Sequence, residues 1–241
     1  ATICAQATVH GSSAIAVIRV SGPDSIDVVS SIFKPYKGVT FSDTKSHNLR
    51  FGAIYKDNEL LDEVLVSLFR APHSYTGEDS VEISCHGSIY IQQEIIFLLL
   101  SKGLRMARPG EFSQRAFLNG KMDLAQAEAV ADLISSETLA SHRIAIQQMK
   151  GGFSKELSVM RQSLLDIVSL MELELDFSEE DVEFADRSRL KELLEKVESH
   201  ISGLIESFKL GNVIKNGVPV AIVGATNTGK STLLNAILGE E

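Results

Sequence analysis

Apolar and polar positions alternate in several short runs of the first hundred residues, a pattern typical of β-strands with one buried face. Two other runs, residues 25–33 and 89–100, have the spacing of helices instead. The predicted strands are residues 14–20, 48–55, 63–69 and 80–85, with a turn at 56–58. The pattern therefore predicts a mixed α/β domain of roughly a hundred residues.

Helical spacing replaces this alternation from Leu124 onward, where alanine, leucine, glutamine, glutamate and isoleucine dominate. Three long helices without strands, at residues 124–150, 154–175 and 189–208, predict a helical bundle as a second domain. A glycine pair at 151 and 152 separates the first two, and residues 211–217 are expected to form a linker. The third helix carries an apolar stripe of Leu190, Leu193, Leu194, Val197, Ile201, Leu204 and Ile205.

Several polar segments invite a functional interpretation. The turn-rich loops 74–79 and 108–113 follow or precede regular elements, and loops on a rigid scaffold are where ligand contacts tend to lie, although many polar loops only turn. The acidic run 172–186 fits a solvated loop better than a divalent-metal loop, because its spacing matches no EF-hand. The six histidines, at positions 10, 47, 73, 86, 142 and 200, form no metal-ligand pattern.

Composition is ordinary for a globular protein, with 44% apolar and 23% charged residues. The formal net charge of −9 argues against a broad nucleic-acid-binding surface, but a local basic patch or a basic partner stays open. Cys4 and Cys85 have no paired spacing, and Cys85 and His86 are expected to point to opposite faces of a strand, which disfavours cysteine catalysis. With no membrane-spanning run and no signal-peptide pattern, a cytoplasmic location is expected.

Residues 224–231 read G-A-T-N-T-G-K-S, the phosphate-binding P-loop pattern. An apolar run at 218–223 precedes this loop and a helical pattern at 232–238 follows it, as a strand, loop and helix would. Glycines let backbone N–H groups converge on a phosphate, Lys230 is placed to reach the β- and γ-phosphates, and the Ser231 hydroxyl is placed to hold Mg²⁺. The alternative is a glycine-rich turn before a helix, which this context disfavours. The sequence therefore predicts a nucleotide site.

Only ten residues follow Ser231. A P-loop domain needs further parallel strands, an acidic Mg²⁺ partner and a residue that orients the attacking water. We therefore expect this chain to be part of a longer protein and to hydrolyse no nucleotide by itself.

Several phrases resemble one family. They are residues 14–23 (A-I-A-V-I-R-V-S-G-P), 75–82 (Y-T-G-E-D-S-V-E), 85–87 (C-H-G) and the long stretch from 108 to 134 around Lys121. Together with the P-loop and its continuation 231–236, they are similar to the MnmE (TrmE) family of tRNA modification GTPases. The long match around Lys121 is the specific one, since a P-loop alone names only a superfamily.

The resemblance implies three parts. These are an α+β, folate-binding, aminomethyltransferase-like N-terminal domain at residues 1–119, an all-α helical domain at 120–212, and the first strand, P-loop and helix of an α/β G domain at 213–241. It also implies a cytoplasmic homodimer that assembles through the N-terminal domain. Such a GTPase acts with the flavoprotein MnmG (GidA) to modify carbon 5 of the wobble uridine in certain tRNAs.

The positions that match the family's folate contacts are Arg19, Glu82 and Lys121, which would take 5-formyl- or 5,10-methylene-tetrahydrofolate. A carboxylate suits the pterin amine and ring N–H, and cations suit the carboxylate tail. The alternative for each residue is an ordinary surface ion pair. Arg19 fits that alternative least well, because it interrupts an apolar strand.

The family's GTP site maps onto Asn227, Thr228, Gly229, Lys230, Ser231 and Thr232. Ser231 would hold Mg²⁺, and Asn227 matches a ligand of an activating K⁺ ion. Two departures stand out: residues 9–13 (V-H-G-S-S) replace a P-P-G-R-G segment, and Thr226 replaces a proline. Two alternatives stay open at this point, a folate-binding and dimerisation module without catalysis, and a P-loop ATPase on an unrelated N-terminal domain.

Overall fold

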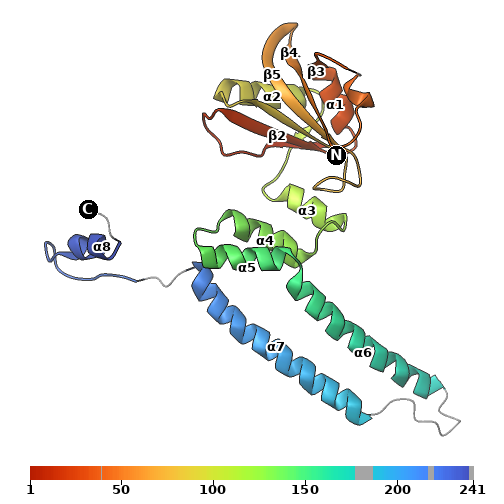
Figure 1. Cartoon of the computed structure of the whole chain (residues 1–241), viewed down its shortest axis with the longest axis vertical. Helices are drawn as coiled ribbons and strands as arrows, with labels where there is room; N and C mark the ends of the chain where they lie inside the picture. The colour runs from red at the N-terminus through yellow and green to blue at the C-terminus, as the bar shows by residue number, and fades with distance from the viewer. Residues whose placement is uncertain (39, 177–186, 217–219, 239–241) are drawn as a thin grey trace. The chain divides into compact units, whose positions relative to one another are not determined.

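The computed structural model describes residues 1–38, 40–176, 187–216 and 220–238 (Figure 1). It contains two compact units, residues 1–131 with 148–154, and residues 132–147 with 155–241. The predicted domain boundaries near residues 120 and 212 stay predictions.

The first unit holds one seven-stranded sheet in the order β3-β4-β5-β6-β2-β1-β7. All neighbouring strands are antiparallel except β1 and β7, which are parallel. The strands are β1 (Ile3–Gln6), β2 (Ile15–Ser21), β3 (Phe33–Pro35), β4 (Asn48–Lys56), β5 (Glu59–Phe69), β6 (Ser80–His86) and β7 (Arg105–Met106). The helices of this unit are α1 (Ser25–Ile32), the 3₁₀ turn η1 (Phe41–Asp43), α2 (Ile89–Ser101), α3 (Glu111–Leu118) and most of α4 (Leu124–Ile134).

The hydrophobic core lies between one face of the sheet and helices α1 and α2. Alternate strand residues such as Ile18, Ile83 and Val66 pack there against Val29 of α1 and Leu99 of α2. Because side chains alternate along a strand, the intervening residues face the other way. That second face, which we call the open face, carries both polar side chains and exposed apolar ones.

The predicted strands and helices of the first unit are confirmed as β2, β4, β5, β6, α1 and α2, with ends within one residue of the prediction except that β5 begins four residues earlier, at Glu59. The predicted turn between β4 and β5 is a two-residue hairpin turn in which Asp57 and Asn58 both have positive φ, 49° and 69°. Positive φ at both central residues is the geometry that matches the twist of a hairpin. The short elements β1, β3, β7 and α3 were not predicted, and residues 111–113 of a predicted loop form the start of α3.

The prediction of one helix over 124–150 is wrong, because two helices, α4 and α5 (Leu139–Met149), replace it. Thr138 and Ser141 form a reciprocal cap at the start of α5, which separates it from α4. The Ser141 N–H donates to Thr138 Oγ1 at 3.1 Å, and the Thr138 N–H donates to Ser141 Oγ at 3.2 Å. Such a cap starts a new helix by satisfying N–H groups that have no partner within it.

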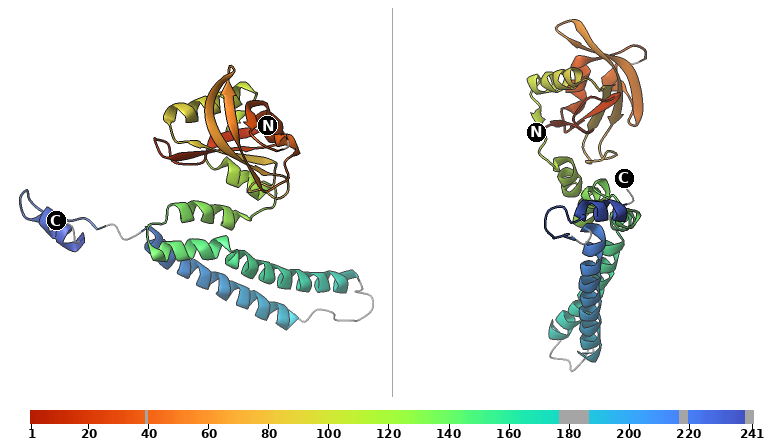
Figure 2. Two further views of the ribbon diagram at one scale, coloured as in Figure 1. Left: turned by 45° about the horizontal axis from the view of Figure 1, so that its top comes forward. Right: turned by 90° about the vertical axis from the view of Figure 1, so that its left-hand side faces the viewer.

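Helix α6 (Gly152–Asp176) and helix α7 (Arg187–Asn216) lie side by side in both Figure 1 and Figure 2. The imidazole of His200 on α7 lies 3.3 Å from the carboxylate of Glu156 on α6. The predicted linker at 211–217 is wrong for residues 211–216, which continue α7, because a single glycine costs a helix only about 1 kcal/mol. Within the described residues, no helix has both the length and the apolar content to cross a membrane.

The end of the chain contains the predicted loop and helix, with α8 at Lys230–Leu238. Residues 220–223, expected to be a strand, are not part of any sheet among the described residues. A strand forms only by pairing its backbone with a neighbour, and the exposed Val220 and Val223 have none there. Residues 217–219 of the same expected strand lie outside the described residues.

Candidate functional site

Arg19 on β2 and Glu82 on β6 lie directly opposite each other on the open face. Arg19 Nε donates to Glu82 Oε1 at 2.9 Å, and Nη2 lies 2.8 Å from the same oxygen. Both side chains are about one quarter exposed, 26% and 29%. The pairing of β2 with β6 therefore creates a charged pair that leaves the second oxygen of Glu82 for another donor.

Two aromatic rings flank the guanidinium group of Arg19. Its central carbon lies 5.0 Å from the ring centroid of Tyr75 and 5.5 Å from that of Phe112. The Tyr75 hydroxyl and the Ser113 hydroxyl lie 2.8 Å apart, which connects the loop after β5 to the first turn of α3. Arg19 is thus enclosed by side chains from three separate segments.

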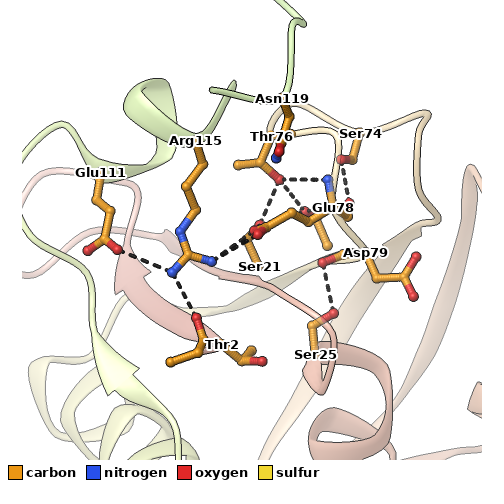
Figure 3. Close-up of polar contacts among 12 residues, drawn as sticks. Thr2, Ser21, Ser25, Ser74, Thr76, Glu78, Asp79, Glu111, Arg115 and Asn119 are labelled. Atoms are coloured by element: carbon orange, nitrogen blue, oxygen red, sulfur yellow. Dashed lines mark hydrogen bonds and ion pairs between the residues drawn. The ribbon is translucent and has the colours of Figure 1, made fainter. Parts of the chain in front are cut away.

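A buried hydroxyl cluster anchors the loop that carries Tyr75 (Figure 3). Thr76 Oγ1 lies 2.7 Å from Ser21 Oγ, and Ser80 Oγ lies 3.2 Å from both. The side-chain amide of Asn119 donates to the Thr76 carbonyl at 2.7 Å. Because every hydroxyl in the cluster has a partner, burial carries no penalty for an unsatisfied polar group, and the loop is held against the sheet.

Charged side chains fix α3 in the same place. Arg115 Nη1 donates to Glu78 Oε2 at 2.9 Å, and Arg115 Nη2 donates to Glu111 Oε1 at 3.2 Å (Figure 3). Glu111 also binds Arg105 and accepts the Arg108 N–H at 2.9 Å. The hydrogen bonds from Arg105, helped by those from Arg108 and Arg115, lower the pKa of Glu111 to about 2 despite its burial.

Lys121, the third residue assigned to folate by resemblance, reaches the same loop from its other side. Its ammonium group donates to the Pro72 carbonyl at 3.0 Å, and its stem lies against Gly77. The loop of residues 72–77 thus contacts Lys121 through the Pro72 carbonyl and Arg19 through the ring of Tyr75. The structure brings Arg19 and Glu82 into contact and connects Lys121 to them through this loop.

The P-loop has the backbone geometry expected of a phosphate cradle. Asn227 and Gly229 have positive φ, 62° and 79°, which turns successive N–H groups toward one side of the loop. Lys230 begins α8 and donates to the carbonyls of Gly224 and Ala225. Ser231 and Thr232 follow in the first turn of that helix, so a phosphate here would meet a helix N-terminus.

His86 has a partner that the sequence did not indicate. Its Nδ1 lies 2.7 Å from Asp62 Oδ1, and its backbone N–H donates to Asp62 Oδ2 at 2.9 Å. The Cys85 side chain points into the core instead, where burial raises its thiol pKa to about 11. No group of three or more potential metal-binding side chains is found among the described residues, which leave out 177–186 of the acidic run.

Tyr75, Phe112 and Ser113 were not singled out individually from the sequence. They lie in the two segments predicted to be polar loops, the second of which forms the start of α3, and nothing in a local pattern indicates that both segments meet over Arg19. The signal available was the occurrence of an aromatic residue in each of two turn-rich segments.

Three family models match the chain. The GTP-binding protein TrmE N-terminus matches residues 2–121, the MnmE helical domain matches 124–227, and the 50S ribosome-binding GTPase matches 219–241. The chain belongs to the MnmE (TrmE) family. It contains the N-terminal domain of this family, its helical domain and the start of a G domain.

Relatives in the MnmE family are similar along the entire chain. Proteins named tRNA modification GTPase MnmE are 64% identical over 241 residues in Bacteroides thetaiotaomicron, 61% over 240 in Flavobacterium johnsoniae and 54% over 242 in Porphyromonas gingivalis. Each alignment covers 100% of this chain but 51–52% of the relative. The chain thus spans about half the length of the curated relatives it matches.

Proposed function

We propose that the intact protein is a tRNA modification GTPase, with its folate domain at residues 1–119, its helical domain at 120–212 and the start of its G domain at 213–241. Its GTP hydrolysis would be coupled to folate-dependent modification of carbon 5 of the wobble uridine. The observation that carries this proposal is similarity along the whole chain to proteins named tRNA modification GTPase MnmE, with 64% identity in Bacteroides thetaiotaomicron. The geometry of both candidate sites supports it.

Residues of the P-loop would hold the nucleotide. The N–H groups around Asn227, Thr228 and Gly229 suit the phosphate oxygens, and Lys230 adds a positive charge. Ser231 would be a ligand of Mg²⁺ and Asn227 a ligand of K⁺, with Thr232 completing the site. Cations there supply positive charge that offsets the negative charge developing on the phosphates during hydrolysis.

Arg19 and Glu82 would bind the pterin end of 5-formyl- or 5,10-methylene-tetrahydrofolate. Arg19 uses Nε and Nη2 on one oxygen of Glu82, which leaves Oε2 as an acceptor for the pterin amine or ring N–H. Lys121 is exposed and its ammonium group donates to the neutral carbonyl of Pro72, so its charge suits the carboxylate tail. The ion pair between Arg19 and Glu82 supports placing Arg19 at the pterin end and leaving Lys121 for the tail.

The open face offers a surface for homodimer formation through the N-terminal domain. Ile15, Leu49, Phe51 and Leu65 are all at least 40% exposed on that face, and Phe51 and Leu65 are direct cross-strand neighbours. Neighbouring exposed apolar side chains such as Phe51 and Leu65 mark interaction sites, and a second copy of this domain would cover them.

The other partners follow from the family. They are a tRNA substrate and the flavoprotein MnmG, with the cytoplasm as the compartment. The free, buried Cys4 and Cys85 suit a reducing compartment.

Calorimetric titration of the protein with 5-formyltetrahydrofolate tests the proposal, with wild type compared with Glu82→Ala. Losing a charged hydrogen-bond partner should weaken binding about 10- to 100-fold. Glu59→Ala is a matched control, because Glu59 is an exposed carboxylate at the far end of β5. Absence of binding by wild type, or equal affinity of Glu82→Ala and wild type, would contradict the folate assignment.

A further inference from the structure

The long side chain of Arg19 projects from the open face of a sheet, where an arginine ordinarily samples many rotamers. Here its guanidinium carbon lies within 5.5 Å of two aromatic centroids, those of Tyr75 and Phe112. A cation over the face of an aromatic ring is attracted by the ring's quadrupole. Two such rings restrict the guanidinium group more than its ion pair with Glu82 would alone.

The rings themselves are held in place by independent contacts. The Tyr75 hydroxyl meets the Ser113 hydroxyl, and Ser113 is the residue next to Phe112. The loop and helix that carry the rings are fixed by Asn119 bound to the Thr76 carbonyl and by Arg115 bound to Glu78 (Figure 3). The loop and the helix that carry the two rings are therefore held by contacts that do not involve Arg19.

The orientation of the Arg19 guanidinium group determines which carboxylate oxygen of Glu82 is left to accept a hydrogen bond from a ligand. With Arg19 held, both of its contacts go to Oε1, so Glu82 keeps one rotamer and presents Oε2. Without the rings, the guanidinium group would turn toward solvent or bind both oxygens. Either change would remove the free acceptor or its fixed direction.

We propose that Tyr75 and Phe112 are positioning residues that hold Arg19, and through it Glu82, in the orientation that binds the pterin edge of a reduced folate. This inference rests on the proposed folate function, and it adds two residues that act on the ligand through Arg19 and Glu82. The ring is the group that contacts Arg19 at each position, and at Tyr75 the hydroxyl group also connects that ring to Ser113.

The first test is calorimetric titration of the full chain with 5-formyltetrahydrofolate. Tyr75→Leu and Phe112→Leu should each weaken binding about three- to tenfold. The conservative Phe112→Tyr should bind like wild type, as should the control Phe97→Leu on the exposed face of α2. In an Arg19→Met background, Tyr75→Leu should have almost no further effect, because no cation remains to be held. An undiminished effect in that background would overturn the positioning role.

The second test needs no folate, so it separates failure of this inference from failure of the proposed function. The ¹⁵N–¹H resonance of the Arg19 Nε–H group should be shifted by the ring currents and should exchange slowly with solvent. Tyr75→Leu and Phe112→Leu should move it toward the position of a free arginine, whereas Phe97→Leu should leave it unchanged. An Arg19 resonance that is the same in all four proteins would overturn the inference, whatever the folate titration gives.

Discussion

Replacing Glu111 by glutamine removes the negative charge on which the start of α3 depends. Glu111 is only 7% exposed, and its carboxylate accepts hydrogen bonds from Arg105, Arg115 and the Arg108 N–H. Its pKa falls from 4.5 to about 2, which at about 1.36 kcal/mol per unit corresponds to about 3 kcal/mol. Because the Arg105 side chain is 43% exposed, solvent screening reduces this to on the order of 2 kcal/mol.

The sign of the pH dependence follows from the direction of the shift. A carboxylate whose pKa is lowered by folding stabilises the native state fully above its unfolded value of 4.5. The contribution is lost as pH falls from about 5 through about 2. Glu111→Gln should therefore differ most from wild type near pH 7, and the difference should shrink by more than half at pH 3.

Tyrosine fluorescence during urea denaturation measures this effect in the right part of the molecule. The chain has no tryptophan, and its four tyrosines, Tyr36, Tyr55, Tyr75 and Tyr90, all lie in the first unit. The free energy of unfolding should drop by about 2 kcal/mol at pH 7 with an unchanged m-value. Glu59→Gln, an exposed carboxylate, serves as the control. A loss below about 0.5 kcal/mol, or an equal loss at pH 7 and pH 3, would refute the reasoning.

Two further outcomes are expected. Gly77→Ala should destabilise the first unit by about 1 kcal/mol, because the φ of Gly77 is 78° and a Cβ there would lie 3.1 Å from the Lys121 stem. Gly203→Ala inside α7 is the control, because a Cβ there meets nothing within 4 Å and alanine should stabilise the helix. Thermal unfolding followed by circular dichroism compares the two variants, and equal effects would contradict this account. Burial raises the pKa of both Cys4 and Cys85 to about 11. A thiol reagent at pH 8 should therefore label both cysteines slowly in the native protein and rapidly in urea. Fast labelling of the native protein would contradict their burial.

The sequence predicted the long elements of the first unit well because their patterns are strong. Strands β2, β4, β5 and β6 each have seven or more residues, enough for alternation to be visible. Strands β1, β3 and β7 have four, three and two residues, and only their neighbours in the sheet define them. Helix α3 escaped prediction for a related reason, since the charged contacts of Glu111 and Arg115 hold it in place.

The sequence predicted which residues belong to the candidate site, but it did not predict the contacts between them. Resemblance singled out Arg19 and Glu82, but their contact depends on the register of β2 against β6, which no local pattern encodes. The aromatic rings over Arg19 depend on a loop and a helix meeting in space. Likewise, the break between α4 and α5 depends on the cap formed by Thr138 and Ser141, which overrides a continuous helical composition.

The position of β1 between β2 and β7 has a consequence for how the protein is made. Ile3 and Cys4 pair with Arg105 and Met106, which leave the ribosome about a hundred residues later. Until then, one side of β1 has an unpaired backbone, and an unpaired strand edge is where a nascent chain pairs wrongly. Completion of this sheet is therefore a late event in synthesis, when the first and last strands of the unit meet.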